Sequence, residues 1–409
     1  MNKLPVHSAP LVPFTASGEL LIGGESLSRL AERAGRTPFY AYDRGLLKAR
    51  VEQLRAVLPR GVKLHFAMKA NPFVPLVCFM AGLVDGIDVA SAGELMVALN
   101  AGADTAEVSF AGPGKSESEL SQAVASGILI NVESEREIEL LAKIADRLNV
   151  KPRVAVRVNP GFELKGSGMK MGGGPKQFGI DEERVPGVLA RVGALGLRFE
   201  GFHLFAGSQN LNAEAVCEAQ RQAYALATRL AVHAPAPVQV LNLGGGFGIP
   251  YFPGDRALDL QPIGDNLAVI SERCARELPG ARIVIELGRY LVGEAGVYVT
   301  RIVDRKVSRG QVFLITDGGL NHHLSASGNF GQVIRKNYPV AINGKADHAR
   351  EVASVVGPLC TPLDLLADRV DLPVADVGDL FVVFQSGAYG ASASPQAFLG
   401  HPPCAEMLV

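Results

Sequence analysis

Lys69 stands where a lysine side chain could react with a carbonyl group. It follows an apolar run, residues 63–67, within the segment F-A-M-K-A-N-P. Desolvation at the end of such a run lowers the pKa of the ammonium group and favours the neutral amine, which forms an imine with a carbonyl. Taken alone, the residue is more often a rim lysine whose charged end reaches water. The interpretation therefore depends on what else the chain carries.

Two later segments carry groups that suit a phosphate and a protonated ring. The G-G-G-F-G stretch at 244–248 exposes backbone N–H groups, which bind phosphate without a second lysine. In E-L-G-R, Glu286 suits a pyridinium nitrogen, while the backbone of Gly288 or Arg289 suits phosphate. Alone, these are more often a tight turn and a surface ion pair. Together with Lys69 they indicate pyridoxal 5′-phosphate (PLP).

The unusual residues fall at the ends of predicted β-strands. Between residues 62 and 286, short β-rich runs alternate with helical patterns, as in repeated βα units around a parallel sheet. We count eight runs: Lys63–Ala67, Gly86–Val89, Glu107–Phe110, Ile128–Val132, Arg153–Val158, Arg198–Phe205, Val238–Leu243 and Arg282–Glu286. Eight units predict a (β/α)8 barrel, in which catalytic groups lie at the carboxyl ends of the strands.

Helix start signals support this reading. Ser116 with Glu119, and Ser134 with Glu137, match the capping box. Asp43 precedes apolar residues at helical spacing and is a further candidate cap.

The chain divides into three predicted parts. After residue 286 the pattern changes to apolar strands: Val297–Val303, Val312–Thr316, Arg350–Val356 and Leu380–Phe384. Strand-like pieces before residue 42 are too short to stand alone, so we expect them to pair with this C-terminal β domain. The expected parts are an N-terminal segment (1–42), a PLP-binding barrel (43–290) and a C-terminal β domain (291–409). The segment 165–175, with five glycines, predicts a mobile loop whose composition permits a lid.

Composition excludes several classes of partner. Forty basic and forty-one acidic residues give a net charge of -1, without the basic stripe that nucleic-acid binding needs. No apolar run reaches membrane-spanning length, and five scattered cysteines argue against disulfides or structural zinc. His322 and His323 are adjacent but lack an evident third ligand. We therefore expect that they bind no metal ion and that they face solvent or an interface. We expect a soluble, cytoplasmic protein that binds a small molecule.

Eight motifs in this order resemble the fold-type III PLP decarboxylases. This is the family of diaminopimelate, ornithine and arginine decarboxylases, whose barrel resembles that of alanine racemase. The motifs are Lys69 in F-A-M-K-A-N-P, Asp88, Arg157, G-S-Q at 207–209, G-G-G-F-G at 244–248, E-L-G-R at 286–289, Cys360 in G-P-L-C, and G-A-Y-G at 387–390. The resemblance covers nearly the whole chain.

The resemblance implies a role for each motif. Lys69 would form the internal aldimine, and Glu286 would pair with the pyridine nitrogen. Cys360 would protonate the carbanion after CO₂ leaves, acting across the interface of a homodimer with shared active sites. The other implied cofactor contacts are Asp88, Arg157, Phe205, Ser208, Gly245, Gly246, Gly288, Arg289 and Tyr389. Free cysteines are more often buried small hydrophobes, and the G-P-L-C motif outweighs that reading.

Three departures from the family bear on the substrate. Thr361 follows Cys360 where the family places an acidic residue for the substrate's distal amine, and Ser325 stands near the place of a distal arginine. Phe205 replaces a ring-stacking histidine. A buried charge without a partner costs several kcal/mol, so free diaminopimelate and ornithine are poor candidates.

The T-P-L-D and S-A-S-G-N-F segments look like a branch found beside acyl-carrier proteins, including the exosortase-associated decarboxylases and a glutamyl-carrier decarboxylase. We therefore expect a glutamyl-like aminoacyl group on a carrier protein. The expected substrate contacts are Arg289, Ser325, Thr361, Asp364 and Tyr389, and a distal carboxylate from Asp364 would weaken this idea. The alternatives are a diaminopimelate decarboxylase of lysine biosynthesis, an amino-acid racemase and a non-catalytic PLP-binding protein.

Overall fold

A computed structural model describes residues 6–166, 168–330, 332 and 335–409. The chain forms two compact units. One, here called the β unit, comprises Met1–Ala49, Pro250–Arg256 and Arg289–Val409. The other, the barrel unit, comprises Arg50–Ile249 and Ala257–Gly288. The N-terminal segment and the short segment 250–256 thus belong to the same unit as the C-terminal third of the chain.

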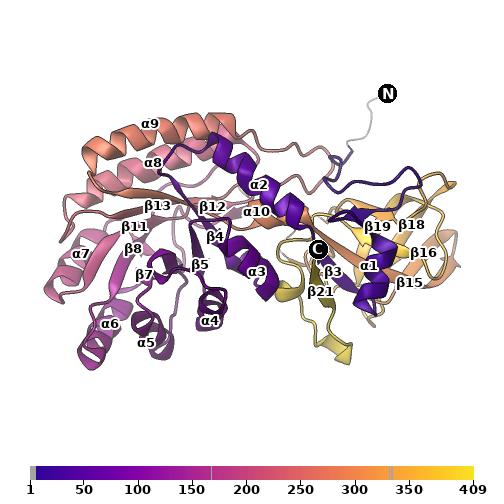
Figure 1. Ribbon diagram of the computed structural model, residues 1–409, viewed down its shortest axis with the longest axis horizontal. Coiled ribbons are helices and arrows are strands. Elements are labelled where there is room, and N and C mark those ends of the chain that lie inside the picture. The colour runs from indigo at the N-terminus through magenta and orange to yellow at the C-terminus, as the bar shows by residue number, and fades with distance from the viewer. Residues whose placement is uncertain (1–5, 167, 331, 333–334) are drawn as a thin grey trace. The chain divides into compact units, whose positions relative to one another are not determined.

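Eight parallel strands close into a barrel (Figure 1). In order around the barrel they are β4 (Lys63–Ala67), β5 (Gly86–Val89), β6 (Val108–Phe110), β7 (Leu129–Val132), β8 (Arg153–Asn159), β11 (Arg198–Leu204), β13 (Val240–Gly245) and β14 (Arg282–Leu287). Pairing of β14 with β4 closes the ring, and β10 (Ile180–Asp181) adds a short pairing to β8. The predicted (β/α)8 barrel is confirmed.

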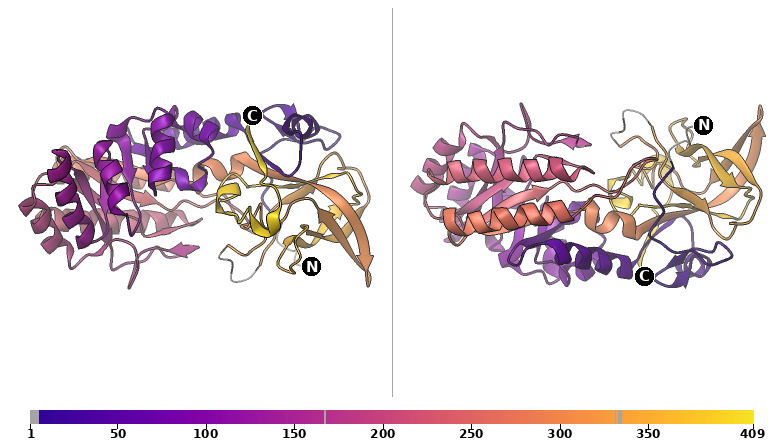
Figure 2. Two further views of the ribbon diagram at one scale, coloured as in Figure 1. Left: turned by 90° about the horizontal axis from the view of Figure 1, so that it is seen from below. Right: turned by 90° about the horizontal axis from the view of Figure 1, so that it is seen from above.

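Helices lie around the outside of this barrel, and α8 and α9 run side by side there (Figure 2). The helices around the barrel are α2 (Arg44–Val57), α3 (Val74–Ala81), α4 (Ala92–Asn100), α5 (Glu117–Ala125), α6 (Glu135–Leu148), α7 (Val185–Ala194), α8 (Ala213–Ala231) and α9 (Gln261–Glu277). Each buries an apolar stripe; in α6 it includes Ile138, Leu141 and Ile144. No helix in the described part of the chain has both the length and the apolar character to span a bilayer.

The predicted helix caps are confirmed with one difference. The Ser116–Glu119 capping box is complete, and Asp43 Oδ1 accepts the Leu46 N–H at 3.0 Å. Ser134 also accepts the Glu137 N–H. The Glu137 side chain, however, accepts the Glu133 N–H at 2.8 Å and binds Lys115 instead of accepting the Ser134 N–H, so this second box is half formed.

The β unit contains a mixed sheet in the order β17–β20–β15–β16–β18–β19, and β3 joins β15 to β21. Its strands are β3 (Phe39–Tyr42), β15 (Gly296–Ser308), β16 (Gln311–Thr316), β17 (Val340–Ile342), β18 (Arg350–Val356), β19 (Leu365–Pro373), β20 (Leu380–Val383) and β21 (Ala405–Leu408). The pair β1 (Leu21–Ile22) and β2 (Glu25–Ser26) precedes α1 (Leu27–Ala34). Leu20, Phe39, Val297 and Val382 belong to one buried cluster, so N-terminal and C-terminal segments share a core.

The expectation that His322 and His323 face solvent or an interface is wrong, because both side chains are buried within the chain itself. They lie in a turn and expose 1% and 0% of their surface. His322 Nε2 is 2.9 Å from the Pro402 carbonyl oxygen, and His323 Nε2 is 2.8 Å from Ser386 Oγ. Burial lowers the pKa of both histidines. Within the described residues, no group of three or more His, Cys, Asp or Glu side chains is placed to hold a metal ion.

We predict that Lys115→Met destabilises the protein. Lys115 is 3% exposed, and its Nζ donates to the Gly112 and Asn131 carbonyls and to Glu137 Oε2 at 3.1 Å. The substitution leaves the Glu137 carboxylate buried without its cation, which lowers the free energy of unfolding by about 3 kcal/mol. Urea denaturation measures this loss. The double variant Lys115→Met/Glu137→Gln should recover part of it, and a single variant as stable as wild type would contradict the prediction.

Candidate active site

The interior of the barrel is built in two layers. Alternate residues of a strand face the same side. Leu129, Ala155, Val240 and Val284, from four strands, pack into one apolar cluster. Two residues further along, each of these strands buries a polar side chain, and the other four strands each add one more. This polar layer consists of His65, Asp88, Ser109, Asn131, Arg157, His203, Asn242 and Glu286.

Glu286 is the buried acid of this layer. Its Oε2 lies 3.0 Å from His203 Nε2 and accepts a 3.4 Å hydrogen bond from Asn242 Nδ2. Burial alone would raise the pKa of Glu286, but the hydrogen bond from His203, with the charges of Lys69 and Arg157, lowers it. Glu286 is therefore an anion at neutral pH. Within the described residues, no hydrogen bond reaches its second oxygen, Oε1.

Lys69 lies immediately beyond β4, in the 3₁₀ turn η1 (Met68–Ala70). Its Nζ is 5.6 Å from the centre of the Phe205 ring, which follows β11. Lys69 is exposed, so the desolvation that we expected at this position is absent from the structure. The amine nevertheless lies at the carboxyl end of a barrel strand, beside the face of an aromatic ring.

The predicted phosphate-binding glycines form a tight backbone cradle. Gly246 has φ of +78°, and a Cβ there would collide with the Gly207 carbonyl. A Cβ on Gly245 would collide with the Glu286 carbonyl. A larger residue at either position would therefore push the end of β13 away from β12 (Gly207–Ser208) or β14. The close approach leaves bare backbone next to Ser208, as a phosphate site requires.

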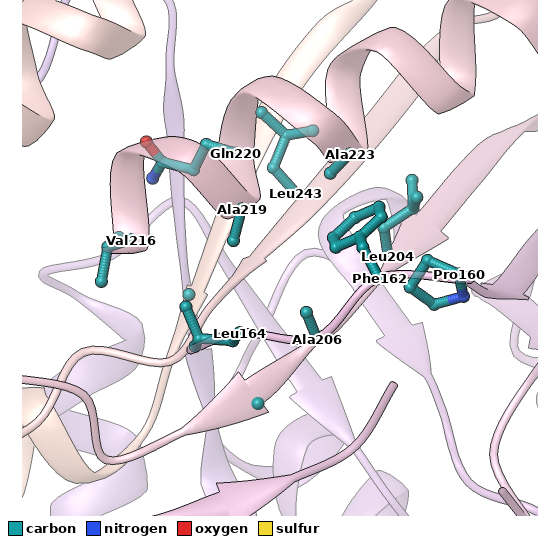
Figure 3. Close-up of a pocket in the computed structure, with 12 residues that line it drawn as sticks. Pro160, Phe162, Leu164, Leu204, Ala206, Val216, Ala219, Gln220, Ala223 and Leu243 are labelled. Carbon is teal, nitrogen blue, oxygen red and sulfur yellow. The ribbon is translucent and has the colours of Figure 1, made fainter. Parts of the chain in front are cut away.

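A small cavity of about 20 Å³ lies beside this cradle (Figure 3), which is room for about one water molecule. Its lining is apolar except for Gln220. The lining side chains are Pro160, Phe162, Leu164, Leu204, Ala206, Val216, Ala219, Gln220, Ala223 and Leu243. The cavity also touches Gly207 and Gly245, so these apolar side chains lie directly against the glycine backbone.

The glycine-rich segment 165–175 is anchored to the same place. Its β9 (Met169–Lys170) pairs with β12 (Gly207–Ser208), and the Met171 N–H donates to the Ala206 carbonyl at 3.1 Å. The Gly173 N–H donates to the Pro160 carbonyl. Backbone hydrogen bonds therefore connect described residues of this segment to the strand that carries Ser208. The predicted mobility of the segment stays a prediction.

Asp88 and Arg157 are both engaged in buried pairs. Asp88 Oδ1 accepts from Ser109 Oγ and lies 3.2 Å from His65 Nδ1. Arg157 donates to Glu133 Oε1 at 2.7 Å and stacks its guanidinium 5.0 Å from the Phe178 ring centre. The pKa of Glu133 is lowered, because the charges of Arg157 and Lys115 outweigh its burial.

Two of the predicted site residues meet in the β unit. The guanidinium carbon of Arg289 lies 4.6 Å from the Tyr389 ring centre, and its NH1 donates to the Tyr251 hydroxyl at 3.0 Å. Arg289 Nε is buried with no partner among the described residues. Ser325 Oγ donates to the Tyr389 carbonyl at 2.8 Å. Ser325 therefore helps to fix the segment that carries Tyr389, which adopts a φ of +53°.

Cys360 is a free, exposed thiol on a turn that Asp364 holds together. Asp364 is 3% exposed, and its two oxygens accept the Leu320 N–H at 2.6 Å and the Leu359 N–H at 2.8 Å. Thr361 Oγ1 accepts the Leu363 N–H at 3.3 Å within this turn. Both carboxylate oxygens of Asp364 are thus committed to the backbone, which gives it a structural role. Its predicted substrate contact stays a prediction.

Sequence reasoning missed several residues that contact the predicted site residues, among them His65, Glu133, His203 and Tyr251. His203 had a detectable signal, because alternation along the predicted strand 198–205 places it on the same face as Phe205. His65 likewise lies on the inward side of β4. Glu133 and Tyr251 lie in segments that follow a strand, where residue spacing does not predict which way a side chain points.

The barrel unit fits a phosphorylated pyridine cofactor. It offers an amine (Lys69), a bare glycine backbone and an anionic carboxylate with an unbonded oxygen (Glu286). These groups follow or end four neighbouring strands, β11, β13, β14 and β4. An amine, a phosphate cradle and an anion for a ring nitrogen are the contacts that PLP requires.

Comparisons with known proteins agree with this fit. A family described as "Pyridoxal-dependent decarboxylase, pyridoxal binding domain" matches residues 44–293. The chain is 40% identical over 379 residues to the L-glutamyl-[BtrI acyl-carrier protein] decarboxylase of Niallia circulans, covering 91% of this chain and 88% of the relative. It is 33% identical over 399 residues to the diaminopimelate decarboxylase of Aquifex aeolicus, covering 96% and 91%. The diaminopimelate decarboxylase of Helicobacter pylori complexed with L-lysine matches with a TM-score of 0.83 and 26% identity, covering 93% and 94%.

We predict that stability declines at alkaline pH because of His65. Burial alone would lower its pKa, but Asp88, with Glu107 at 3.8 Å, raises it to about 9. In the unfolded chain the pKa of a histidine is about 6.5. The stabilisation from protonated His65 is therefore complete below pH ~6.5 and is lost as the pH rises through the folded-state pKa of about 9. The free energy of unfolding should fall by roughly 3 kcal/mol over this interval. Urea denaturation across the interval measures it, with His65→Gln as a control that lacks the decline; an equal decline in the variant would contradict the assignment.

Proposed function

Because this chain belongs to the pyridoxal-dependent decarboxylases, we propose that its substrate is a glutamyl-like aminoacyl group carried by an acyl-carrier protein. The chain is a PLP-dependent amino-acid decarboxylase, and the proposal concerns which amino acid it accepts. If the side-chain carboxyl is bound to the carrier, the distal end is uncharged, while the α-carboxylate stays free to leave as CO₂.

The observation that carries this proposal is the lack of a free charged group among the residues predicted at the distal end. Ser325 is neutral and donates to a backbone carbonyl. Thr361 is neutral, and Asp364 binds two backbone N–H groups. A charged distal amine or carboxylate would be buried there without a partner, at a cost of several kcal/mol. The 40% identical relative, named for a glutamyl group on an acyl-carrier protein, supports the same conclusion.

We assign the cofactor contacts by residue. Lys69 Nζ would hold the cofactor through its aldehyde carbon. Gly245, Gly246 and Ser208 bind the phosphate through the cradle. Glu286, kept anionic in the polar layer, pairs with the ring nitrogen. When bound, PLP accepts the electrons that the departing carboxylate leaves behind.

The remaining assigned residues support the cofactor and substrate. Phe205 lies beside Lys69 and offers an aromatic face on which the cofactor ring would stack. Asp88 and Arg157 stay in the roles implied by the family, near the lysine and the ring. Gly288, Arg289 and Tyr389 complete the phosphate and substrate contacts.

Cys360 Sγ delivers the proton to the substrate's α-carbon, in a site that two copies of the chain share. The thiol is exposed, as a residue that serves a second copy must be before assembly. Beside its turn lies a cleft of about 480 Å³, lined by apolar side chains such as Phe313 and Ile315 and by polar ones such as Gln311 and Asp368. A recess in which apolar side chains lie among polar ones is a surface on which a second copy of the chain can pack, which supports the proposed homodimer.

Substrate selectivity tests the distal-end argument. We expect the PLP-loaded protein to release CO₂ from glutamyl-loaded carrier protein, with kcat/KM on the order of a hundredfold above that for free diaminopimelate, ornithine, lysine, arginine or glutamate. Carrier loaded with the α-methyl ester of the glutamyl group is the matched control, because no carboxylate can leave.

A variant sharpens the same test. Thr361→Glu introduces the acid that diaminopimelate decarboxylases carry after the cysteine, so it should raise turnover of free diaminopimelate relative to wild type. Rapid turnover of free diaminopimelate by the wild-type protein would instead support a diaminopimelate decarboxylase. Inversion of an amino acid without CO₂ release would indicate a racemase.

Mixing two inactive variants tests the shared site. Lys69→Ala and Cys360→Ala should each abolish or strongly reduce correct product formation, while Cys360→Ala keeps the visible absorbance of bound PLP. Random mixed dimers contain one intact shared site, so mixing equal amounts should restore about a quarter of wild-type activity. No recovery after verified subunit exchange would show that Lys69 and Cys360 do not act across copies.

A further inference from the structure

Glu286 is held by two neighbours rather than by one. His203 on β11 and Asn242 on β13 both reach Oε2, at 3.0 and 3.4 Å. His203 is 1% exposed and Asn242 is 5% exposed, so water does not compete for these contacts. Asn242 Oδ1 also accepts the Gly244 N–H at 2.8 Å. The carboxylate is therefore tied to the first glycine of the phosphate cradle as well as to the histidine.

The surroundings of His203 select which ring nitrogen carries the hydrogen. Nδ1 is buried and has no partner among the described residues. A hydrogen on Nδ1 would be a buried donor with nothing to accept it, which costs about 1–3 kcal/mol. A hydrogen on Nε2 points at Glu286 Oε2 and makes a hydrogen bond to a charged acceptor, which is stronger than a neutral one. His203 is thus the Nε2–H donor to the carboxylate.

We propose that His203 is a positioning residue for the cofactor's ring nitrogen. By donating to Oε2 it fixes the orientation of the Glu286 carboxylate and keeps it ionised, which leaves Oε1 for the ring nitrogen. The inference rests on the proposed pairing of Glu286 with that nitrogen. It adds a residue that touches neither cofactor nor substrate and acts through Glu286.

Variants of His203 separate a hydrogen-bond donor from a space-filling role. His203→Gln places an amide nitrogen near the position of Nε2 and keeps the donor. His203→Asn stops short of Oε2, and His203→Leu removes the donor. Asn131→Leu is the matched control, because Asn131 is a 2% exposed polar residue of the same layer that bonds to Ser109 and not to Glu286. Glu286→Gln is measured in parallel.

Two readouts do not depend on turnover: the dissociation constant of PLP from the reconstituted protein, by equilibrium dialysis, and the pH at which the absorbance of bound PLP changes. We expect His203→Leu and His203→Asn to weaken PLP binding by roughly tenfold, the value of a hydrogen bond to a charged group. The absorbance midpoint should shift as it does in Glu286→Gln. His203→Gln and Asn131→Leu should keep wild-type values, and kcat should fall in the donor-less variants with little change in KM.

The outcomes distinguish the inference from its premise. If Glu286→Gln is impaired but both donor-less variants match wild type, the role of His203 is overturned while that of Glu286 stands. If Glu286→Gln itself binds PLP like wild type with an unchanged absorbance midpoint, the proposed pairing fails. If His203→Gln is as impaired as His203→Leu, the Nε2–H donor is not what matters. Should His203→Leu not fold, the comparison of His203→Asn with His203→Gln decides.

Discussion

The burial of the Glu286 carboxylate is the constraint on which the rest of the site depends. A carboxylate removed from water without partners would take up a proton and lose its negative charge. The barrel prevents this by placing hydrogen-bond donors on the neighbouring strands. Two-residue alternation along each strand makes the arrangement possible. The four strands that bury Leu129, Ala155, Val240 and Val284 in the apolar layer each carry a polar residue of the next layer two positions later: Asn131, Arg157, Asn242 and Glu286.

Closure of the sheet brings together residues that are far apart in the sequence. Lys69 and Glu286 are separated by more than half of the chain, yet β14 pairs with β4. The glycine cradle stands at the end of β13, between the strands that carry His203 and Glu286. The site is therefore a product of strand order. A change that slipped the register of one strand would turn its polar residue outward and leave a neighbouring partner buried alone.

Some of this was accessible from the sequence, for physical reasons that differ from element to element. Strands of the barrel are predictable because they are short apolar runs buried on both faces, and the helix starts at Ser116 and Asp43 follow from local capping chemistry. The motif residues could be identified from their types. Strands β17, β19 and β21 escaped prediction, because their pairing partners are distant in the sequence and supply what their own patterns lack.

The partners of the site residues could not be predicted in the same way. Nothing local indicates that Glu137 turns away from Ser134 towards Lys115, or that Asp364 binds the Leu320 and Leu359 amides. The burial of His322 and His323 likewise depends on Pro402 and Ser386, which are distant in the sequence. Residue type indicates which chemistry is possible, whereas tertiary contacts determine whether a group is free to perform it.

The pairing of β9 with β12 also makes ligand binding and local order interdependent. Residues 169–170 use Gly207 and Ser208 as their pairing partners. Any ligand that immobilises Ser208 therefore stabilises the glycine-rich segment, and by thermodynamic reciprocity, ordering that segment tightens the grip on the ligand. Resistance of this segment to proteolytic cleavage should consequently report how fully the protein is loaded with its cofactor, independently of any catalytic assay.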